Sequence, residues 1–383
     1  MTRLHRILAG GAASVAMAGT AHAGGVERAN QGIAFLFEEG TYAELGFGRL
    51  DPDVSGDLVA LPSIKTGNML GGENIASGAF KTDLNENIVL GFIIDQPVGA
   101  TVRYPTGTNH PFAGSTADLE STALTGYLRY KFGNGFSAIG GLRAQRVEGN
   151  VSLPSIPGYS LSTNNDLEYG YSFGVAYERP DIALRVSLMY NSEIEHSFEG
   201  VETIFNPLAG GIVSIPGEFD TKIPQSVTLD FQTGVAADTL VFGSIRWVDW
   251  SEFEINPDVY SQAVLAGNPF GITYPLASYQ SDSITYRLGV GRRFSENWSG
   301  AFSVVYEPDV GDIFGNLGPV DGRTGVGLGV TYSQEKMKIS AGVEYSWLGD
   351  AISQSPVGQP GDPVSDFQDN TSISYGIRVG YYF

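Results

Sequence analysis

Short and long connections alternate along the whole chain, and they separate segments in which apolar and polar residues themselves alternate. The short connections are tight turns rich in Gly, Pro, Asn, Asp or Ser, such as "DQP" at 95–97 and "GNG" at 133–135. A meander with tight turns at one end and long loops at the other is typical of a transmembrane antiparallel β-barrel, whereas a soluble β-sandwich needs no such strict alternation. The pattern therefore predicts an all-β fold, a transmembrane antiparallel β-barrel of about 14 strands over residues 40–383, preceded by a short N-terminal segment.

The predicted strands lie near residues 40–50, 83–95, 97–106, 118–132, 135–149, 166–179, 181–199, 221–236, 238–251, 282–294, 297–307, 323–333, 337–348 and 370–383. The predicted long loops are residues 51–82, 107–117, 150–165, 200–220, 252–281, 308–322 and 349–369. No apolar run approaches the roughly 18–20 residues that a membrane helix needs.

Arginines occur on the polar face of several predicted strands. In the segment 118–132, for example, Leu124 and Leu128 share one face while Thr125 and Arg129 occupy the other. An arginine that faced lipid at the bilayer midplane would cost about 2–4 kcal/mol. The arginines predicted to face the interior are therefore Arg129, Arg143, Arg185, Arg246, Arg287 and Arg378.

The first 23 residues have the composition of a secretory signal peptide. Arg3 and Arg6 precede a short apolar run of small residues that ends in the cleavage pattern Ala21-His22-Ala23. An exported chain could form disulfides, but this sequence has no cysteine. The net charge of −20 argues against a nucleic-acid partner, because phosphate binding requires clustered Lys and Arg.

The chain closes on the strand-like sequence "SISYGIRVGYYF" at 372–383. Its apolar parity is predicted to contact outer-membrane lipids, Arg378 to face the lumen, and its backbone to pair with the segment 40–50 so that no sheet edge remains open. The terminal Phe383 resembles the C-terminal signal that the barrel-assembly machinery recognises, which makes that machinery a predicted partner.

Several stretches resemble the FadL-type outer-membrane transporters of long-chain fatty acids and other hydrophobic compounds. The segment 169–200 is similar to a strand pair of that family, with Tyr190, Ser192, His196 and Gly200 in matching places, and 223–254 is similar to the next hairpin. The resemblance covers roughly residues 85–383. It implies a monomeric channel in the bacterial outer membrane that passively takes up hydrophobic small molecules.

The chain departs from this family at its N-terminus, where the usual hatch with an Asn-Pro-Ala phrase is missing. Residues 24–39 are either a reduced plug or a periplasmic leader; as a plug, the segment would place Ile33, Phe35, Leu36 and Phe37 in the lumen. The family also releases substrate sideways at a kinked third strand. Here Pro97, Gly99 and Pro105 flank "VGATVRY", and because proline cannot donate to a ladder, a local gap in hydrogen bonding is expected.

Two sets of residues are candidates for substrate binding. The inward arginines could bind a fatty-acid carboxylate through paired hydrogen bonds, or they could form an internal ion-pair network with Asp230, Asp249, Glu168 and Glu344. The long loops contain apolar stretches that would be unexpected on an outer surface unless they contact a hydrophobic ligand. The loop candidates are Leu58, Leu61, Ile64, Met69, Leu70, Val264, Leu265, Phe270 and Ile272.

No catalytic or metal-binding constellation is evident, and the sequence predicts neither enzymatic activity nor a cofactor. The four histidines are scattered, and His196 alone is a strand-borne base for an outer-membrane protease or lipase. The alternatives to a hydrophobe channel are a general diffusion porin, which is expected to have a charged constriction, and a structural barrel without transport.

Overall fold

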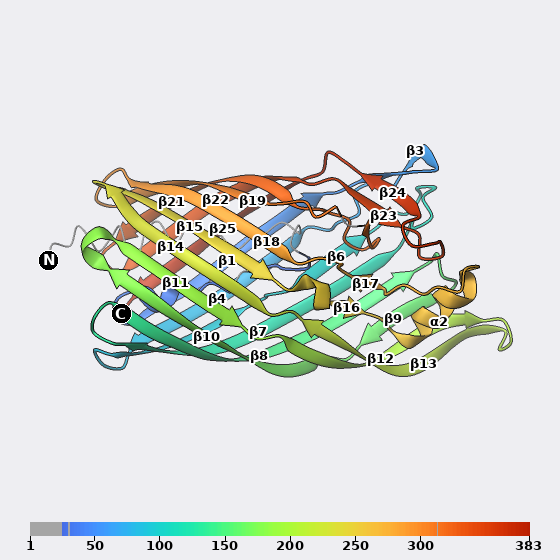
Figure 1. The fold of residues 1–383 in the computed structure, drawn as a ribbon, viewed down its shortest axis with the longest axis horizontal. Helices are drawn as coiled ribbons and strands as arrows, with labels where there is room; N and C mark the ends of the chain where they lie inside the picture. The colour runs from blue at the N-terminus through green and yellow to red at the C-terminus, as the bar shows by residue number, and fades with distance from the viewer. Residues whose placement is uncertain (1–24, 30, 312) are drawn as a thin grey trace.

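The computed structural model describes residues 25–29, 31–311 and 313–383, so the predicted signal peptide, residues 1–23, lies outside the described residues. The chain forms a closed antiparallel barrel of 14 strands, which confirms the predicted fold class (Figure 1). The wall consists of β1 (Tyr42–Asp53), β4 (Glu73–Asp83), β5 (Ile88–Asp95) continued by β6 (Gly99–Arg103), β7 (Thr116–Lys131), β8 (Phe136–Leu153), β10 (Asp166–Arg179), β11 (Leu184–Asn191) continued by β12 (Ile194–Asn206), β13 (Gly211–Ile223) continued into β14 (Ser226–Ala236), β15 (Thr239–Val248), β18 (Ser283–Arg293), β19 (Trp298–Glu307), β21 (Arg323–Gln334), β22 (Met337–Leu348) and β25 (Thr371–Tyr382).

We call the end of the barrel that carries the long connections the loop end, and the opposite end, with the tight turns and the C-terminus, the turn end (Figure 1). The remaining elements lie mainly at the loop end. A small sheet there contains β2 (Gly56–Leu58), β3 (Leu61–Lys65), β20 (Ile313–Phe314), β23 (Ala351–Gln354) and β24 (Pro363–Phe367), and β16 (Glu254–Ile255) pairs with β17 (Ala277–Ser278). The other elements are β9 (Tyr159–Thr163), α2 (Asp258–Gly267), η2 (Ala34–Phe37), η3 (Pro180–Ile182) and η4 (Trp250–Glu252). Within the described residues, none of these helices is long and apolar enough to cross a membrane.

The barrel closes by pairing its first and last strands, as predicted. β1 and β25 pair in register from Tyr42↔Tyr382 to Asp53↔Thr371. The apolar residues of β25 point outward, with Ile377 44% exposed, while the Arg378 guanidinium lies 3.7 Å from the carboxylate of Glu44. The seam therefore carries the same inside–outside polarity as the rest of the wall.

The two faces of the wall differ in the way the alternation predicts. On β7, Leu124 is 52% exposed on the outer face, whereas Thr125 and Arg129 are 2% and 4% exposed on the inner face. Aromatic pairs such as Tyr130–Phe132 lie on the outside near the strand ends, with ring centroids 5.2 Å apart. An apolar outer band with aromatic residues at its margins is the surface that a bilayer requires of a barrel.

Two predicted strand assignments are wrong, although the strand count is right. The segments 83–95 and 97–106 do not form a hairpin around "DQP", because β5 and β6 both pair antiparallel with β7 and form one interrupted wall strand. The wall strand before them is β4, which lies in the predicted loop 51–82. A proline between two apolar runs is typical of a turn, but here Pro97 interrupts a single strand. The prediction thus counts one strand too many at residues 83–106 and omits β4, so the total of 14 is unchanged.

The predicted loop 200–220 is also wrong. β12 and β13 continue as a long hairpin that pairs from Ile194↔Ile223 to Asn206↔Gly211, so only residues 207–210 connect them. This hairpin extends beyond the wall at the loop end (Figure 1).

Candidate functional site

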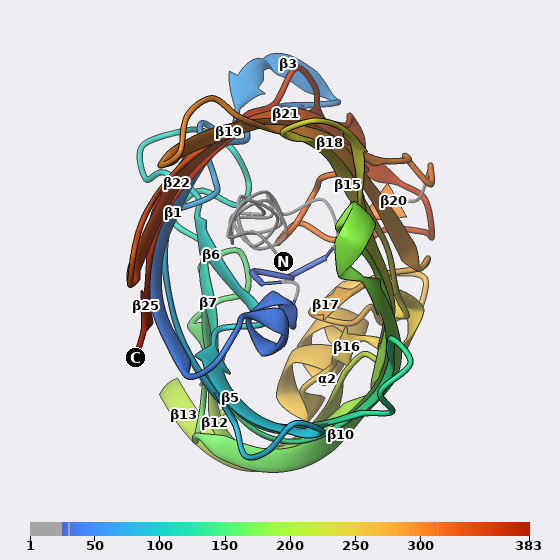
Figure 2. The same cartoon turned by 90° about the vertical axis from the view of Figure 1, so that its left-hand side faces the viewer.

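The N-terminal segment, residues 25–29 and 31–39, lies inside the barrel, where η2 is visible in the view along the barrel axis (Figure 2). Ile33, Phe35 and Leu36 are at most 4% exposed and pack against inward residues of the wall such as Tyr127. Gly91 makes room for them, because a Cβ atom there would lie 2.3 Å from Cδ2 of Leu36. Phe37, the fourth residue predicted for the plug, packs partly buried beside this cluster.

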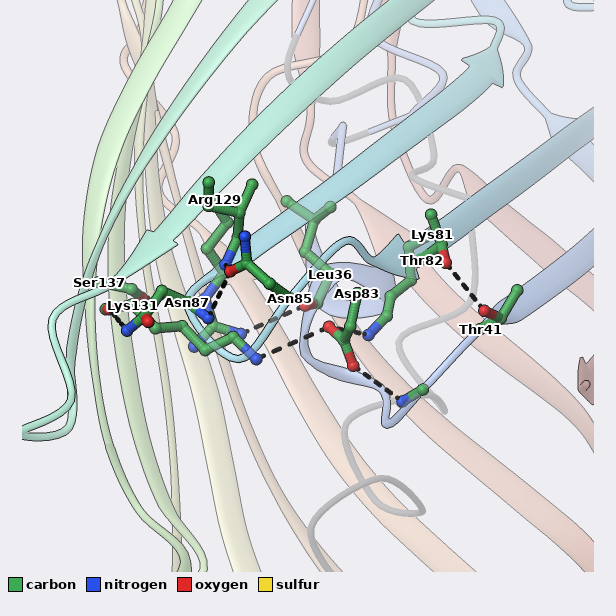
Figure 3. Close-up of polar contacts among 12 residues, drawn as sticks. Leu36, Thr41, Lys81, Thr82, Asp83, Asn85, Asn87, Arg129, Lys131 and Ser137 are labelled. Atoms are coloured by element: carbon green, nitrogen blue, oxygen red, sulfur yellow. Dashed lines mark hydrogen bonds and ion pairs between the residues drawn. The ribbon is translucent and has the colours of Figure 1, made fainter.

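Polar contacts tie the N-terminal segment to several parts of the wall. Nε of Arg246 donates to Oε1 of Glu27 at 2.9 Å, and Nζ of Lys338 donates to Oε1 of Glu38 at 2.8 Å. Nη1 of Arg129 donates to the Leu36 carbonyl at 3.2 Å (Figure 3). The segment is thus held by charged contacts as well as by apolar packing.

At the turn end, a cluster around Asp83 fixes the point where the N-terminal segment leads into β1 (Figure 3). The Asp83 carboxylate accepts hydrogen bonds from Nζ of Lys81 at 2.9 Å and from the backbone N–H of Gly40 at 3.1 Å, and it lies 3.6 Å from Nζ of Lys131. Lys81 is 1% exposed, so its ammonium depends on this carboxylate for compensation.

The arginines predicted to face the interior do so, and polar or aromatic groups of the wall and the N-terminal segment contact each of them. Besides its contact with Leu36, Arg129 ion-pairs with Glu178, and Arg246 pairs with Glu27 rather than with a predicted carboxylate. Of the predicted acidic partners, Glu344 pairs with Arg287 at 2.6 Å. The other contacts are Arg143 Nη2 with Asn191 Oδ1 at 2.9 Å, and Arg185 with Gln232 Oε1 at 3.0 Å and over the Phe37 ring at 4.6 Å.

An apolar cavity, the upper cavity, lies in the half of the barrel nearest the loop end. Its wall comes from the outer halves of the strands, and its cover comes from the segments 253–279 and 315–318. Rings of Phe198 and Phe219 lie 5.4 Å apart, and those of Phe253 and Tyr279 lie 5.7 Å apart. The other apolar residues of the lining are Val26, Ala100, Val102, Ala117, Leu119, Val151, Leu161, Ile255, Leu276, Ala277 and Leu317.

A second cavity, the lower cavity, has a charged lining. Residues 31–35 and Phe37 form part of its wall, whereas Val26 of the same segment lines the upper cavity. The N-terminal segment therefore lies between an apolar and a charged compartment. The charged residues of the lower cavity are Glu44, Asp95, Arg185, Asp230, Arg287 and Arg378.

The nine predicted loop residues are scattered, and none of them lines the upper cavity. Met69 and Leu70 are buried in one apolar cluster and Val264 in another, and Leu70 also reaches a smaller neighbouring cavity of about 340 Å³. Leu58, Ile64 and Ile272 are half-buried. The exposed residues of the set are Leu61, Leu265 and Phe270.

The inner face of β7 carries a sequence signal for the upper cavity. Along this face the polar residues Arg129, Thr125 and Ser121 alternate with Tyr127 and Ala123, whereas the last two inward residues toward the loop end, Leu119 and Ala117, are both apolar. The end of the strand without inward polar residues is where the cavity lies.

The barrel wall is interrupted where β5 ends and β6 begins, as the sequence around Pro97 predicts. The ladder between β4 and β5 runs from Asp83↔Val89 to Gly78↔Ile94, while the ladder of β6 is with β7. We call the region between residues 73–77 of β4 and residues 96–100 the wall gap. In it, side-chain Oε1 of Gln96 accepts the N–H of Ala76 at 3.0 Å in place of a backbone partner.

The N-terminal segment supplies the remaining contacts at the wall gap. The Pro97 carbonyl accepts the N–H of Arg28 at 2.9 Å, and the Val26 carbonyl accepts the N–H of Gly99 at 2.8 Å. The Arg28 guanidinium ion-pairs with Glu73, the first residue of β4. It fills the space beside Gly99, because a Cβ atom there would lie 2.1 Å from Cζ of Arg28.

Both histidines in the described part of the chain have hydrogen-bond partners, and Nδ1 of His110 accepts the backbone N–H of Phe112 at 3.3 Å. Nδ1 of His196 lies 2.8 Å from Oδ2 of Asp166, and Nε2 of His110 lies 3.0 Å from Oγ of Ser365 in the loop-end sheet. Burial lowers the pKa of His110 below its usual value. Among the described residues, no group of three or more acidic, His or Cys side chains is arranged to hold a metal ion.

Comparisons with known proteins agree with this architecture. The model of the family described as outer membrane protein transport protein (OMPP1/FadL/TodX) matches residues 9–383. A search of curated protein sequences found no match. Among solved structures, a FadL homologue of Pseudomonas aeruginosa is similar with a TM-score of 0.72 at 17% identity, over 96% of this chain and 97% of that chain.

Two further structures carry informative names. The CymD monoaromatic hydrocarbon channel has a TM-score of 0.61 at 16% identity, over 96% of this chain and 98% of that chain. The toluene transporter TodX of Pseudomonas putida has a TM-score of 0.65 at 11% identity, over 96% of this chain and 99% of that chain. At such identities these likenesses establish the fold.

Proposed function

This chain belongs to the OMPP1/FadL/TodX family of outer membrane transport proteins, and we propose that it passes hydrophobic compounds from the upper cavity sideways through the wall gap. Its place is the outer membrane, with the loop end outside the cell and the turn end in the periplasm. The observation that carries the proposal is that β6 borders both features. Ala100 and Val102 line the upper cavity, while Gly99 borders the wall gap one residue earlier.

The first step is capture from the outside. An apolar molecule that leaves water for the upper cavity gains about 25 cal/mol for each Å² of apolar surface that it buries. The cavity's apolar and aromatic lining suits a monoaromatic hydrocarbon or part of a fatty-acid chain. No energy source is needed for this step, since the molecule moves down its own free-energy gradient.

The second step is release, and the polarity of the lumen favours the wall over the periplasm. Passage straight through the barrel would take an apolar molecule past the N-terminal segment and into the charged lower cavity. The wall gap opens instead toward the apolar outer band of the barrel. Displacement of the Arg28 guanidinium and of the Gln96 side chain would connect the upper cavity with the membrane.

Uptake into cells that lack other channels of this family tests the proposal. Cells that express the protein should take up labelled toluene or oleate faster than cells without it, while uptake of a small sugar should not change. Ala117→Phe fills the upper cavity and should reduce hydrophobe uptake; Leu124→Phe, on the lipid face of the same strand, is the matched control. Increased sugar uptake without hydrophobe uptake would instead indicate a diffusion porin.

A further inference from the structure

We infer that the upper cavity selects uncharged hydrophobic molecules and discriminates against their carboxylate analogues. The inference rests on the proposed function, because it concerns which hydrophobes enter the same cavity. It also decides between two substrate classes that both fit a hydrophobic channel, namely fatty acids in their ionised form and neutral hydrocarbons.

The lining of the upper cavity contains no basic side chain among the described residues. Its one acidic residue, Asp118, has the outward parity of β7, and both of its carboxylate oxygens accept hydrogen bonds from Nη2 of the exposed Arg103 at 2.6 Å. The other polar side chains are Thr163, Ser278 and Tyr279, and burial raises the pKa of the Tyr279 hydroxyl, which keeps it neutral. A carboxylate ligand would thus find no cationic partner among the described residues of the lining.

The arginines of the lumen do not supply a cationic partner for a carboxylate in the upper cavity. Arg185 and Arg287 line the lower cavity, on the other side of the N-terminal segment, and Arg287 is already paired with Glu344. Arg28, the basic residue at the wall gap, is paired with Glu73. An ionised acid in the upper cavity would lose its hydration without gaining a charged partner, and such a transfer is strongly unfavourable.

The aromatic content of the lining favours neutral guests further. The side chains of Phe198, Phe219, Phe253 and Tyr279 line the cavity. Aromatic rings attract other rings in offset or edge-to-face arrangements, whereas the negative face of a ring repels an anion. Neutral hydrocarbons, including monoaromatic ones, therefore match the lining best.

A matched pair of ligands tests the inference directly. Hexylbenzene and 6-phenylhexanoate share a phenylalkyl skeleton and differ in the carboxylate, and their binding can be measured on the protein in lipid nanodiscs after subtraction of binding to empty nanodiscs. At pH 8 we expect hexylbenzene to bind at least about 100-fold more tightly. Between pH 8 and pH 5 the apparent affinity for the acid should rise at least about tenfold, since an ordinary carboxylic acid becomes partly neutral, while hexylbenzene binding stays constant.

A charge placed in the cavity should change the preference. Leu317→Lys introduces an ammonium on the loop that covers the cavity, and it should strengthen binding of 6-phenylhexanoate at pH 8 while it weakens binding of hexylbenzene. Leu317→Met, which keeps the size and the neutrality, should bind like the unaltered protein. Equal affinity of the unaltered protein for both ligands at pH 8 would overturn the inference and leave the channel function intact, whereas binding of neither ligand would overturn both.

Discussion

Replacing Arg28 by methionine should loosen the N-terminal segment from the wall gap. The side chains of Arg28 and Glu73 are 6% and 2% exposed, so their ion pair is buried. Removing one member of a buried pair costs about 3–5 kcal/mol, because the remaining charge stays buried without its counter-charge. Even the lower value, about 3 kcal/mol, changes the ratio of docked to released segment about 150-fold.

Hydrogen exchange of the backbone amides measures this ratio. The N–H groups of residue 28 and Ala29 both donate to the Pro97 carbonyl, and the N–H of Gly99 donates to the Val26 carbonyl. Arg28→Met leaves these groups in place, so faster exchange reports release of the segment rather than loss of a donor. We expect the protection of the amides of residues 28, 29 and 99 to fall about 100-fold or more and hydrophobe uptake to rise.

Two variants serve as controls for this experiment. Arg49→Met removes an ion pair with Asp51 in which the two side chains are 38% and 36% exposed, and because solvent screens such a pair, the protection of the segment should stay unchanged. The double replacement Arg28→Met and Glu73→Met removes both charges and should recover most of the protection, since apolar residues can replace a buried pair. If Arg28→Met alone kept the protection of the unaltered protein, the ion pair would not hold the segment at the wall gap.

Three further predictions concern the same assembly. Glu27 and Val98 face each other in an antiparallel bridge, so cysteines at both positions should form a disulfide that stops hydrophobe uptake until it is reduced. Glu27→Cys alone should not respond to reductant. Full uptake by the oxidised pair would show that the segment need not move. Gly91→Val should lower the free energy of unfolding of the barrel by about 1–3 kcal/mol, because the new side chain clashes with η2. Gly140→Val, at a position with open space around it, should not lower it. Equal melting temperatures of the two variants would argue against close packing of η2. The pKa of His110 is lower in the folded protein than in the unfolded loop, so the unfolded loop takes up a proton at a higher pH than the folded protein does. The cover of the barrel is therefore fully stable above about pH 6.5 and loses stability as the pH falls below that value. Limited proteolysis of residues 104–115 at pH 7.5 and pH 5 should detect the loss, and His110→Gln should abolish the difference.

The wall could be predicted from the sequence because the polarity of each wall residue depends on whether its side chain contacts lipid or the lumen. The alternation of Leu124, Thr125 and Leu128 reflects which of them contacts lipid, and the cost of an arginine in lipid fixes the direction of Arg129. The closing seam follows in the same way, since an unpaired strand edge is not tolerated in a membrane.

The wall gap was only partly predictable. Pro97 indicates a break in hydrogen bonding, but a break inside a strand and a turn between two strands have the same local sequence. The distinction depends on β7, which is long enough to pair with both β5 and β6. The strand β4 was missed because its sequence "ENIASGAFKTD" is rich in small and polar residues and alternates weakly.

The residues that line the upper cavity were the least predictable part of the chain. Apolar loop residues such as Met69 and Val264 are buried among other loop residues, so their hydrophobicity supports the cover of the barrel. The upper cavity is formed where eight wall and loop segments converge, and convergence is a property of the tertiary structure. The local sequence indicates the cavity only where the inward residues of a strand become apolar, as from Ser121 to Leu119 on β7.

The N-terminal segment between the two cavities has a consequence for the cell that carries this protein. An outer membrane protects its owner by keeping out small polar solutes, and every water-filled pore weakens that protection. A barrel that receives its cargo in an apolar chamber and releases it through its side has no need of an aqueous path from one face to the other. Many copies could then be present in the membrane without making it permeable to ions, sugars or polar toxins, so the amount of the protein is free to follow the supply of hydrophobic nutrients.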